Sequence, residues 1–235
     1  MVPSPPVRGL TLFIDADDTL WENNVFFDRI VAEYVAMVGR HGCPPEHARE
    51  RLLEIERART RQFGYGIANF QQSLEAACAA LLEGRDWQDE AGAIRELCSG
   101  LRRQAVVHLQ EVDETLRVLG SRHRLILLTK GDLDDQMGKV ARSGLRGRLH
   151  QVDVVVEKDV AAYRDALRRH GADPARSWMI GNSPKSDILP ALEAGLGAVF
   201  IPHAATWSLE LVDLPEQMPE RFVVLDSFRA LTELF

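Results

Sequence analysis

The sequence predicts an α/β protein in which a doubly wound parallel sheet carries an inserted all-α domain. Three observations favour this fold: short apolar runs that stop at polar residues, helical segments that alternate with the later runs, and a long stretch with only helical periodicity. A strand, a helix and a strand in succession make a right-handed crossover, so the alternation indicates strands that run parallel.

The strands are expected where short apolar runs lie between turn signals, the pattern of strands buried on both faces. These runs are Leu10–Ile14, Leu125–Leu128, Val152–Val156, Trp178–Ile180 and Ala198–Ile201, with Phe222–Leu225 as a last edge strand. The helices expected between the later runs are Asp132–Ser143, Asp159–His170 and Asp187–Ala194. A glycine follows each of them, as it often does at the end of a helix: Gly144, Gly171 and Gly195.

The segment from about Asn24 to about Gln110 has helical periodicity and no convincing strand. Apolar residues recur there at helical spacing, for example at Leu74, Cys78 and Leu81. We therefore expect on the order of four helices, inserted after the first strand. The predicted division is a catalytic core of residues 1–23 and 111–235 and a helical cap of residues 24–110. Because both ends of the insertion return to the same place, the cap is expected over the ends of the strands.

Composition and charge exclude several classes of protein. Of the 235 residues, 46% are hydrophobic and 27% charged, and the net charge of −7 comes from acidic and basic residues mixed along the chain. A nucleic-acid-binding surface would show clustered Lys and Arg, so no nucleic-acid partner is expected. No stretch approaches the ~20 apolar residues that span a bilayer. The N-terminus also lacks the apolar segment of a signal peptide, so we expect no membrane partner and a cytoplasmic location.

The three cysteines, Cys43, Cys78 and Cys98, have neither the spacing of a metal site nor an even number for a disulfide framework. We expect reduced thiols.

Polar residues follow four of the predicted strands, at the edge where open parallel sheets bind ligands. The four segments are Asp15–Thr19, Thr129–Asp132, Glu157–Asp159 and Gly181–Asp187. Together they supply carboxylates, a hydroxyl, a lysine and glycines. These are the parts that phosphoryl transfer requires.

In these segments the sequence resembles the haloacid dehalogenase-like (HAD) hydrolases. The first motif of that family, Asp-x-Asp-x-Thr after an apolar strand, is Asp15–Thr19 here, and the second, a Ser or Thr, is Thr129. The third motif, a lysine, is Lys158, and the acidic fourth motif is Gly181–Asp187. The resemblance implies a Rossmann-like core, and the insertion looks like the helical (C1-type) cap of the family.

The resemblance implies a phosphatase that depends on magnesium (Mg²⁺) and acts on a small phosphorylated metabolite. Asp15 would attack phosphorus to form an aspartyl-phosphate and would also bind the metal. Asp17 would give its backbone carbonyl to the metal, and its carboxyl would serve as general acid and then general base. Asp187 would be the second carboxylate ligand, in keeping with the preference of Mg²⁺ for hard oxygen donors.

The remaining motif residues are expected to bind the phosphoryl group. Thr129 and the amides around Lys130 and Gly131 would hold phosphoryl oxygens, and Lys158 would pair with the charge on these oxygens and on Asp15. Two neighbours are assigned no role in the chemistry: Asp18 is expected to form a turn or a helix cap, and Lys185 to face solvent.

One residue departs from the family pattern. Asn182 stands where the fourth motif commonly has its first aspartate. An amide brings no negative charge, so Asp187 is the better direct ligand, and weaker metal binding or weaker activity is left open.

Substrate recognition is expected from residues near the first motif and in the cap. The residues predicted to bind substrate there are Trp21, Tyr65 and Asn69. Arg57, Arg61 and Gln71 also surround the Gly64–Gly66 turn, although a solvated helix face explains the cap residues equally well. His203 and Trp207 lie after a strand on the same side, and packing accounts for the Trp. A homodimer is left open.

Four alternative functions share some of these features. A 2-haloacid dehalogenase uses the same nucleophile on carbon but has no leaving oxygen to protonate, so Asp17 argues for phosphate esters. Phosphonate hydrolysis needs a substrate-facing lysine, and no lysine occurs before Lys130. A receiver module would carry its motifs in another order and would lack the insertion. A degenerate, non-catalytic binding protein is suggested only by Asn182.

Overall fold

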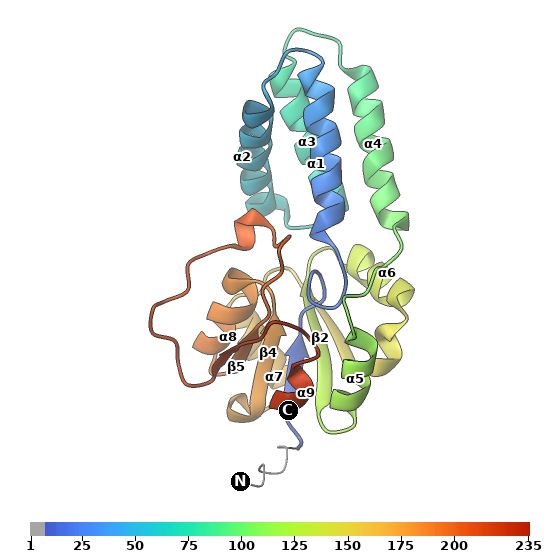
Figure 1. Cartoon of the computed structure of the whole chain (residues 1–235). Helices are drawn as coiled ribbons and strands as arrows, with labels where there is room; N and C mark the ends of the chain where they lie inside the picture. Colours follow the sequence, from blue (N-terminus) through green and yellow to red (C-terminus); the bar gives the residue numbers. More distant parts are fainter. Residues whose placement is uncertain (1–7) are drawn as a thin grey trace. The chain divides into compact units, whose positions relative to one another are not determined.

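The computed structural model describes residues 8–235 and places them in an α/β fold. Among these residues, six parallel strands form one sheet in the order β3-β2-β1-β4-β5-β6 (Figure 1). The strands are β1 (Thr11–Ile14), β2 (Arg124–Lys130), β3 (Gln151–Val155), β4 (Ser177–Gly181), β5 (Gly197–Phe200) and β6 (Phe222–Val224). This confirms the predicted Rossmann-like class. Residues 1–7, which the sequence assigns to the core and in which it shows no signal peptide, lie outside the described part.

The described chain divides into two compact units. The sheet unit runs up to Asn24 and includes Val106–Lys130 and Lys139–Phe235. The helical unit consists of Val25–Ala105 together with Gly131–Gly138. The second of these segments was not expected in the helical unit, because it begins the helix that follows β2.

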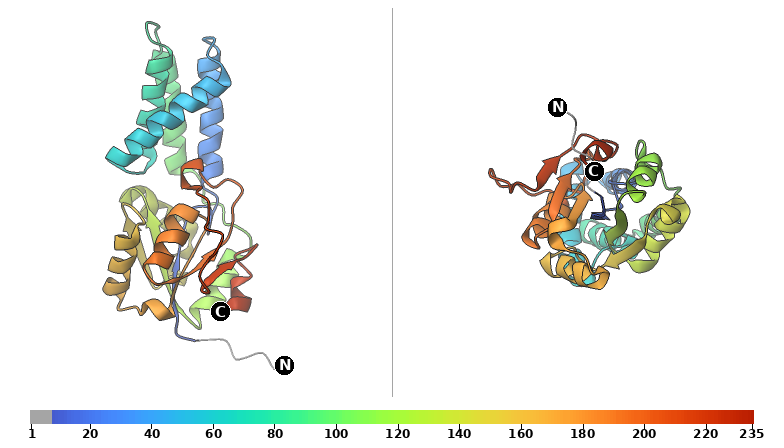
Figure 2. Two further views of the ribbon diagram at one scale, coloured as in Figure 1. Left: turned by 90° about the vertical axis from the view of Figure 1, so that its left-hand side faces the viewer. Right: turned by 90° about the horizontal axis from the view of Figure 1, so that it is seen from below.

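Helices cover both faces of the sheet, which makes the unit doubly wound (Figure 2). On one face, α5 (Val112–Gly120) and α9 (Leu231–Leu234) pack with Leu12, Ile14 and Leu127 in one apolar cluster. On the other face, α7 (Val160–His170) and α8 (Leu189–Glu193) pack with side chains such as Phe13 and Ile126. Successive side chains of a strand point to opposite faces, so a sheet covered on both sides needs continuous apolar strands. This requirement explains the uninterrupted apolar runs of the sequence.

The register of the central strands aligns the ends from which the motifs emerge. β1 lies between β2 and β4, with Ile14 opposite Leu127 on one side and Ile180 on the other. The backbone N–H of Asp15 continues this ladder by donating to the carbonyl of Ile180 at 2.9 Å. The carboxyl ends of β1, β2 and β4 therefore meet at one edge, as parallel strands must.

The helical unit has an apolar core of its own. Its helices are α1 (Asn24–Gly39), α2 (Pro45–Phe63), α3 (Ile67–Leu81) and α4 (Gln88–Arg103). Large buried side chains such as Tyr34, Leu52 and Leu74 pack in this core. Cys43, Cys78 and Cys98 are free thiols, and burial raises the pKa of Cys78 to about 11 and that of Cys98 to about 12. The helical insertion thus folds around an apolar centre, as its periodicity predicts.

A tight turn and a carboxylate fix the start of α3. Gly64 and Gly66 have φ values of 77° and 136°, a region that side chains with a Cβ rarely adopt. The N–H of Ile67 donates to Asp135 Oδ2 at 2.9 Å, and Asp135 Oδ1 accepts from Arg102 at 3.3 Å. Asp135 belongs to the first turn of α6 (Leu133–Ser143). These bonds explain why Gly131–Gly138 groups with the helical unit.

Two further observations complete the fold. The helix predicted at Asp187–Ala194 begins earlier, as one π-helical turn (Pro184–Ile188) that continues into α8. Ser183 caps this turn by accepting a bond from the Ser186 N–H at 2.9 Å.

Within residues 8–235, no helix has the length and apolar character needed to cross a bilayer.

Candidate active site

A buried lysine joins two of the predicted site carboxylates. Lys158, between β3 and α7, lies with its ammonium against Asp15 Oδ1 and 2.7 Å from Asp187 Oδ1. Asp15, Lys158 and Asp187 are 6%, 3% and 1% exposed. The structure thus brings together three residues that come from the first, third and fourth motifs and that lie up to 172 positions apart in the sequence.

Burial and charge shift the pKa values of Asp15 and Lys158. Burial raises the pKa of Asp15 to about 7; the Lys158 ammonium opposes this shift, while Asp187 and Asp17 add to it. Burial alone would lower the pKa of Lys158, but the two carboxylates outweigh it, so the net shift is upward. Lys158 is therefore held as a cation among an excess of carboxylates.

The fourth motif reaches this trio because Gly181 leaves room for Asp187. A Cβ built on Gly181 would lie 2.2 Å from Asp187 Oδ2, closer than any real contact. The same oxygen accepts the Ser183 N–H at 3.0 Å. Gly181 and the turn after it thus determine the direction of the Asp187 side chain.

Asn182 belongs to the hydrogen-bonding network of the first motif. The Thr19 hydroxyl lies 3.0 Å from Asp15 Oδ2 and 3.3 Å from Asn182 Oδ1. The Asn182 amide nitrogen donates to Thr206 Oγ1 at 2.8 Å. The residue that departs from the family pattern is therefore buried beside Asp15 and fixed at both ends of its amide.

Trp21 and Lys139 both contact the Asp17 carboxylate. Its Oδ1 accepts from Trp21 Nε1 at 2.8 Å, and the Lys139 ammonium lies 2.7 Å from Oδ1 and 2.5 Å from Oδ2. Lys139 also donates to Asn23 Oδ1 at 3.0 Å. Trp21 was predicted to bind substrate, but it is only 1% exposed and packs in the sheet core. Its contact with the site is made through Asp17.

Lys130 is turned toward carboxylates. Its ammonium lies 2.7 Å from Glu210 Oε1, 2.7 Å from Ser186 Oγ and 3.2 Å from Glu157 Oε1. Thr129, the neighbouring residue, is buried near the end of β2. The charge of Lys130 is thus engaged within the protein, which leaves only the backbone around it for the predicted phosphate contact.

Several residues predicted for substrate binding lie in the helical unit. Asn69 donates to the Gly64 carbonyl at 2.7 Å and accepts from Arg59 at 3.1 Å, so its amide stabilises the turn before α3. Tyr65 is partly buried in that turn, and Gly131, with φ of 139°, begins the segment that groups with the helices. Contact of these three with substrate stays a prediction.

Asp18 caps a helix, as predicted. Its Oδ1 accepts the N–H of Asn23 at 2.9 Å and that of Asn24, the first residue of α1, at 3.1 Å. Burial raises the pKa of Asp18 to about 7. His203 lies 3.7 Å from Asp18 and 3.4 Å from Glu22, in a small group of titratable side chains. Backbone N–H groups already engage two of these side chains. Asp18 accepts the two bonds just described, and His203 Nδ1 accepts from the Ala205 N–H at 3.3 Å.

Sequence reasoning missed Lys139 and Glu210. Lys139 contacts Asp17 across 122 positions, and Glu210 contacts Lys130 across 80, so neither contact leaves a local pattern. One signal was available. The chain has only four lysines among its 28 lysines and arginines, and each of the four comes just after a predicted strand or in the helix that follows one.

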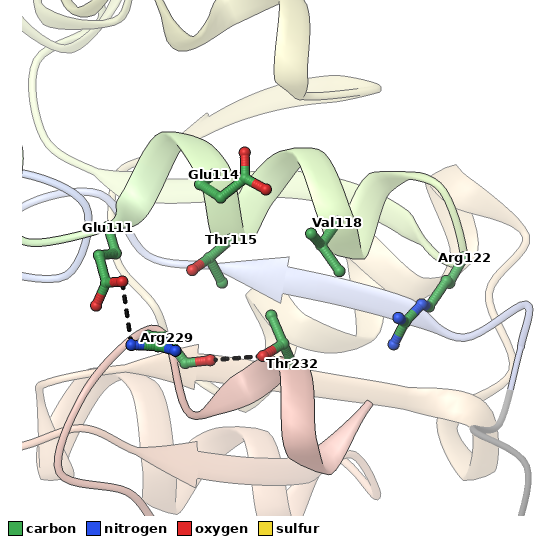
Figure 3. A pocket seen from close by; sticks show the side chains of 7 residues that line it. All are labelled: Glu111, Glu114, Thr115, Val118, Arg122, Arg229 and Thr232. Carbon is green, nitrogen blue, oxygen red and sulfur yellow. Dashed lines mark hydrogen bonds and ion pairs between the residues drawn. The ribbon is translucent and has the colours of Figure 1, made fainter.

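A surface pocket of about 320 Å³ lies elsewhere on the sheet unit, beside α5 and α9 (Figure 3). Arg229 pairs there with Glu111 at 3.3 Å, and Thr232 also lines the pocket. None of the motif residues lines it, so the pocket does not belong to the candidate active site.

Comparisons with known proteins match the part of the chain that carries the motif residues. The sequence matches the model of the haloacid dehalogenase-like hydrolases over residues 10–195. It is also similar to the glyceraldehyde 3-phosphate phosphatase of Methanothermobacter thermautotrophicus, with 34% identity over 87 residues. That match covers 34% of this chain and 37% of the relative, so it spans just over a third of the relative's length.

Solved structures share the fold. A haloacid dehalogenase-like family hydrolase from Xanthomonas campestris superposes with a TM-score of 0.84 and 26% identity, covering 97% of this chain and 93% of that one. A 2-haloacid dehalogenase from Pseudomonas syringae pv. Tomato DC3000 gives 0.63 and 23%, covering 96% and 97%. The HAD hydrolase YfnB from Bacillus subtilis, solved bound to magnesium, gives 0.65 and 15%, covering 97% and 98%. The last two likenesses concern the fold alone.

Proposed function

This chain belongs to the haloacid dehalogenase-like hydrolase family, and from that premise we propose that it is a Mg²⁺-dependent phosphatase of a small phosphorylated metabolite. The observation that carries the proposal is the buried contact of Lys158 with both Asp15 and Asp187. A nucleophilic carboxylate, a second carboxylate and a cation meet there at the carboxyl edge of the sheet. A phosphoryl group brings its own negative charge and needs such compensation.

The residues present suit a magnesium ion. Asp15 and Asp187 are both within contact of one ammonium, so the buried group has more carboxylates than cations. Carboxylate oxygens are the ligands that Mg²⁺ prefers, and one or two of them suffice because the ion keeps several waters. Asp15, the backbone carbonyl of Asp17 and Asp187 would hold it. When bound, the ion would supply positive charge that compensates the negative charge of the carboxylates and of the phosphoryl group.

The first chemical step would belong to Asp15. A carboxylate oxygen of Asp15 attacks phosphorus, the bond from phosphorus to the ester oxygen breaks, and its electron pair stays on the leaving oxygen. Lys158 compensates the charge on the phosphoryl oxygens during this transfer, and Thr129 with the amides beside it orients them. The product is an aspartyl-phosphate on Asp15.

Asp17 would handle the proton in both steps. Its protonated carboxyl gives a proton to the leaving oxygen, which departs as an alcohol. A water molecule then attacks the phosphorus of the aspartyl-phosphate and gives a proton back to Asp17. Inorganic phosphate leaves, and the Asp15 carboxylate is regenerated.

The substrate class is proposed from the curated relative. The matched protein is named a glyceraldehyde 3-phosphate phosphatase, which makes short-chain sugar phosphates the first compounds to test. An alkyl phosphate of this kind has a poor leaving group, and Asp17 supplies the acid that such a group needs.

A decisive assay would follow hydrolysis of p-nitrophenyl phosphate and of glyceraldehyde 3-phosphate, with Mg²⁺ and with EDTA. The variants are Asp15→Asn and Asp17→Asn, and Asp213→Asn, an exposed site in the same unit, is the control. We expect activity that needs Mg²⁺, is abolished by Asp15→Asn and is unchanged in the control. Hydrolysis that survives both EDTA and Asp15→Asn would overturn the proposal.

The same assay addresses the dehalogenase alternative. With 2-chloropropionate as substrate, release of chloride without release of phosphate from either ester would favour reaction at carbon. Asp17 supports the phosphatase, because a leaving halide needs no proton donor and a leaving alkoxide does. Trp21 and Lys139 hold the Asp17 carboxyl in place.

A further inference from the structure

The carboxyl of Asp17 is tied to a lysine outside the four motifs. Lys139, on α6 in the sheet unit, places its ammonium 2.7 Å from Oδ1 and 2.5 Å from Oδ2. The side chains of Lys139 and Asp17 are 17% and 22% exposed. A partly buried pair with contacts to both oxygens differs from an exposed ion pair, whose members rarely hold one geometry.

Trp21 holds one oxygen of the Asp17 carboxyl from a buried position. Its indole ring is buried in the sheet core, and its N–H donates to Asp17 Oδ1 at 2.8 Å. The last torsion of an aspartate side chain has a broad energy minimum, so a single hydrogen bond does not fix the plane of the carboxyl. Lys139 contacts both Oδ1 and Oδ2 and so restricts rotation about that torsion.

Orientation matters for an acid that must reach a leaving oxygen. A proton donor works within about 2.6–3.2 Å of its acceptor, and a misplacement of about 1 Å costs on the order of 10²-fold in rate. In the first step, the cost falls on substrates whose leaving group needs the proton. p-Nitrophenolate departs readily without one, whereas an alkoxide does not.

We propose that Lys139 is a positioning residue for the Asp17 carboxyl and that it governs hydrolysis of alkyl phosphates more than that of aryl phosphates. The inference rests on the proposed phosphatase function and deepens it. In the step concerned, an oxygen of Asp15 bonds to phosphorus, the bond from phosphorus to the alkyl oxygen breaks, its electron pair stays on that oxygen, and the proton moves there from Asp17. Lys139 keeps its own proton throughout and acts by holding Asp17 in the direction of the leaving group.

The test compares kcat/KM on p-nitrophenyl phosphate with kcat/KM on glyceraldehyde 3-phosphate in Lys139→Met, because kcat/KM reports the step in which the leaving group departs and excludes the later hydrolysis that both esters share. Methionine keeps most of the length of the side chain and removes the charge and the donors. The control is Arg142→Met, which removes an exposed cation from the same helix. We expect kcat/KM on the alkyl ester to fall about tenfold or more beyond any fall on the aryl ester. Lys139→Arg should recover part of that loss, and Arg142→Met should change neither value.

A double-variant cycle separates positioning from a general structural effect. If Lys139 acts through Asp17, then Asp17→Asn with Lys139→Met should be no slower on the alkyl ester than Asp17→Asn alone. Losses that multiply in the double variant, or an equal fall in kcat/KM on both esters in Lys139→Met, would overturn the inference. Thermal melting of each variant checks that the fold persists.

Failure of the inference is distinct from failure of the proposed function. An unselective Lys139→Met enzyme that Asp15→Asn still inactivates remains a phosphatase, and only the role of Lys139 is lost. Activity that survives Asp15→Asn removes the proposed function itself.

Discussion

The ammonium of Lys130 lies 2.7 Å from the carboxylate of Glu210, a residue 80 positions later in the chain. Glu210 also accepts from the hydroxyl of Ser183 at 2.7 Å and from that of Ser186 at 2.5 Å. One buried carboxylate thus connects the end of β2 with the turn that carries Asp187. This network positions two of the four motifs relative to each other.

We expect Glu210→Ala to destabilise the protein strongly. Glu210 is buried, so its removal leaves the Lys130 ammonium, which is largely shielded from solvent, with fewer partners. Loss of one member of a buried ion pair costs about 3–5 kcal/mol in the free energy of unfolding. Urea denaturation would measure this, with the exposed Glu216→Ala as control, expected to stay within about 0.5 kcal/mol of the wild type. Equal midpoints for the two variants would contradict the role of the network.

The stabilisation by Glu210 should also depend on pH. Burial alone would raise the pKa of Glu210, but Lys130 and the Ser186 and Ser183 hydroxyls outweigh it and lower the pKa. A lowered pKa gives stability that is complete above the ordinary glutamate value, about 4.3, and is lost as the pH falls through the folded-state value. The free-energy difference between wild type and Glu210→Gln should therefore shrink on acidification. A constant difference from pH 7 to pH 3 would argue against this.

Gly181→Ala should impair the site without unfolding the protein. The new methyl group would overlap Asp187 Oδ2, so the Asp187 side chain must turn away from Lys158. A displacement of about 1 Å at the site predicts a loss of kcat of the order of 10²-fold. Gly147→Ala, where a Cβ meets nothing within 4 Å, is the matched control and should keep full activity. Wild-type turnover in Gly181→Ala would show that the direction of Asp187 is unimportant.

Asn182→Asp should strengthen Mg²⁺ binding and lower the stability of the metal-free protein. The change adds a third carboxylate beside Asp15 and Asp187, and like charges at close range repel in the absence of a cation. We expect a lower Tm without metal and a larger rise in Tm on adding Mg²⁺ than in the wild type, measured by calorimetry. Gln217→Glu adds the same charge at an exposed position and should change neither quantity. An unaltered response to Mg²⁺ would place Asn182 outside the influence of the metal.

The raised pKa of Asp15 predicts how the stability of the metal-free protein varies with pH. Its pKa rises on folding from the ordinary value of about 3.9 to about 7, mainly through burial. A raised pKa gives stability that is complete below about pH 4 and is lost as the pH rises through about 7. Metal-free wild type should therefore lose stability relative to Asp15→Asn between pH 5 and pH 8, by an amount of the order of 1 kcal/mol or more. Unfolding curves in EDTA would check this, and parallel pH profiles of the two proteins would contradict it.

The sheet and the motif residues were predictable because their signals are local. A strand covered on both faces must be apolar throughout, so runs such as Leu125–Leu128 identify β2 directly. The meeting of Asp15, Lys158 and Asp187 followed from one rule, that carboxyl ends of parallel strands share an edge.

The partners of these residues were not predictable in the same way. Lys139 and Glu210 lie in a helix and a loop whose local sequence gives no indication of the strand end they contact. The assignment of Gly131–Gly138 to the helical unit depends likewise on the bond between Asp135 and the first N–H of α3, which are 68 positions apart. Packing and polar pairing between residues far apart in the chain determine such contacts, and the local periodicity of the sequence does not reveal them.

The proposed phosphatase activity requires that Asp15 carries the phosphoryl group during turnover. Acid quenching of the enzyme in the steady state with glyceraldehyde 3-phosphate and Mg²⁺, followed by peptide mass spectrometry, would detect that group. We expect a phosphoryl adduct on the peptide that contains Asp15, absent in Asp15→Asn and in EDTA, and more abundant in Asp17→Asn during burst turnover of p-nitrophenyl phosphate. Phosphate release at the full rate with that peptide unmodified under all of these conditions would rule out an aspartyl-phosphate on Asp15.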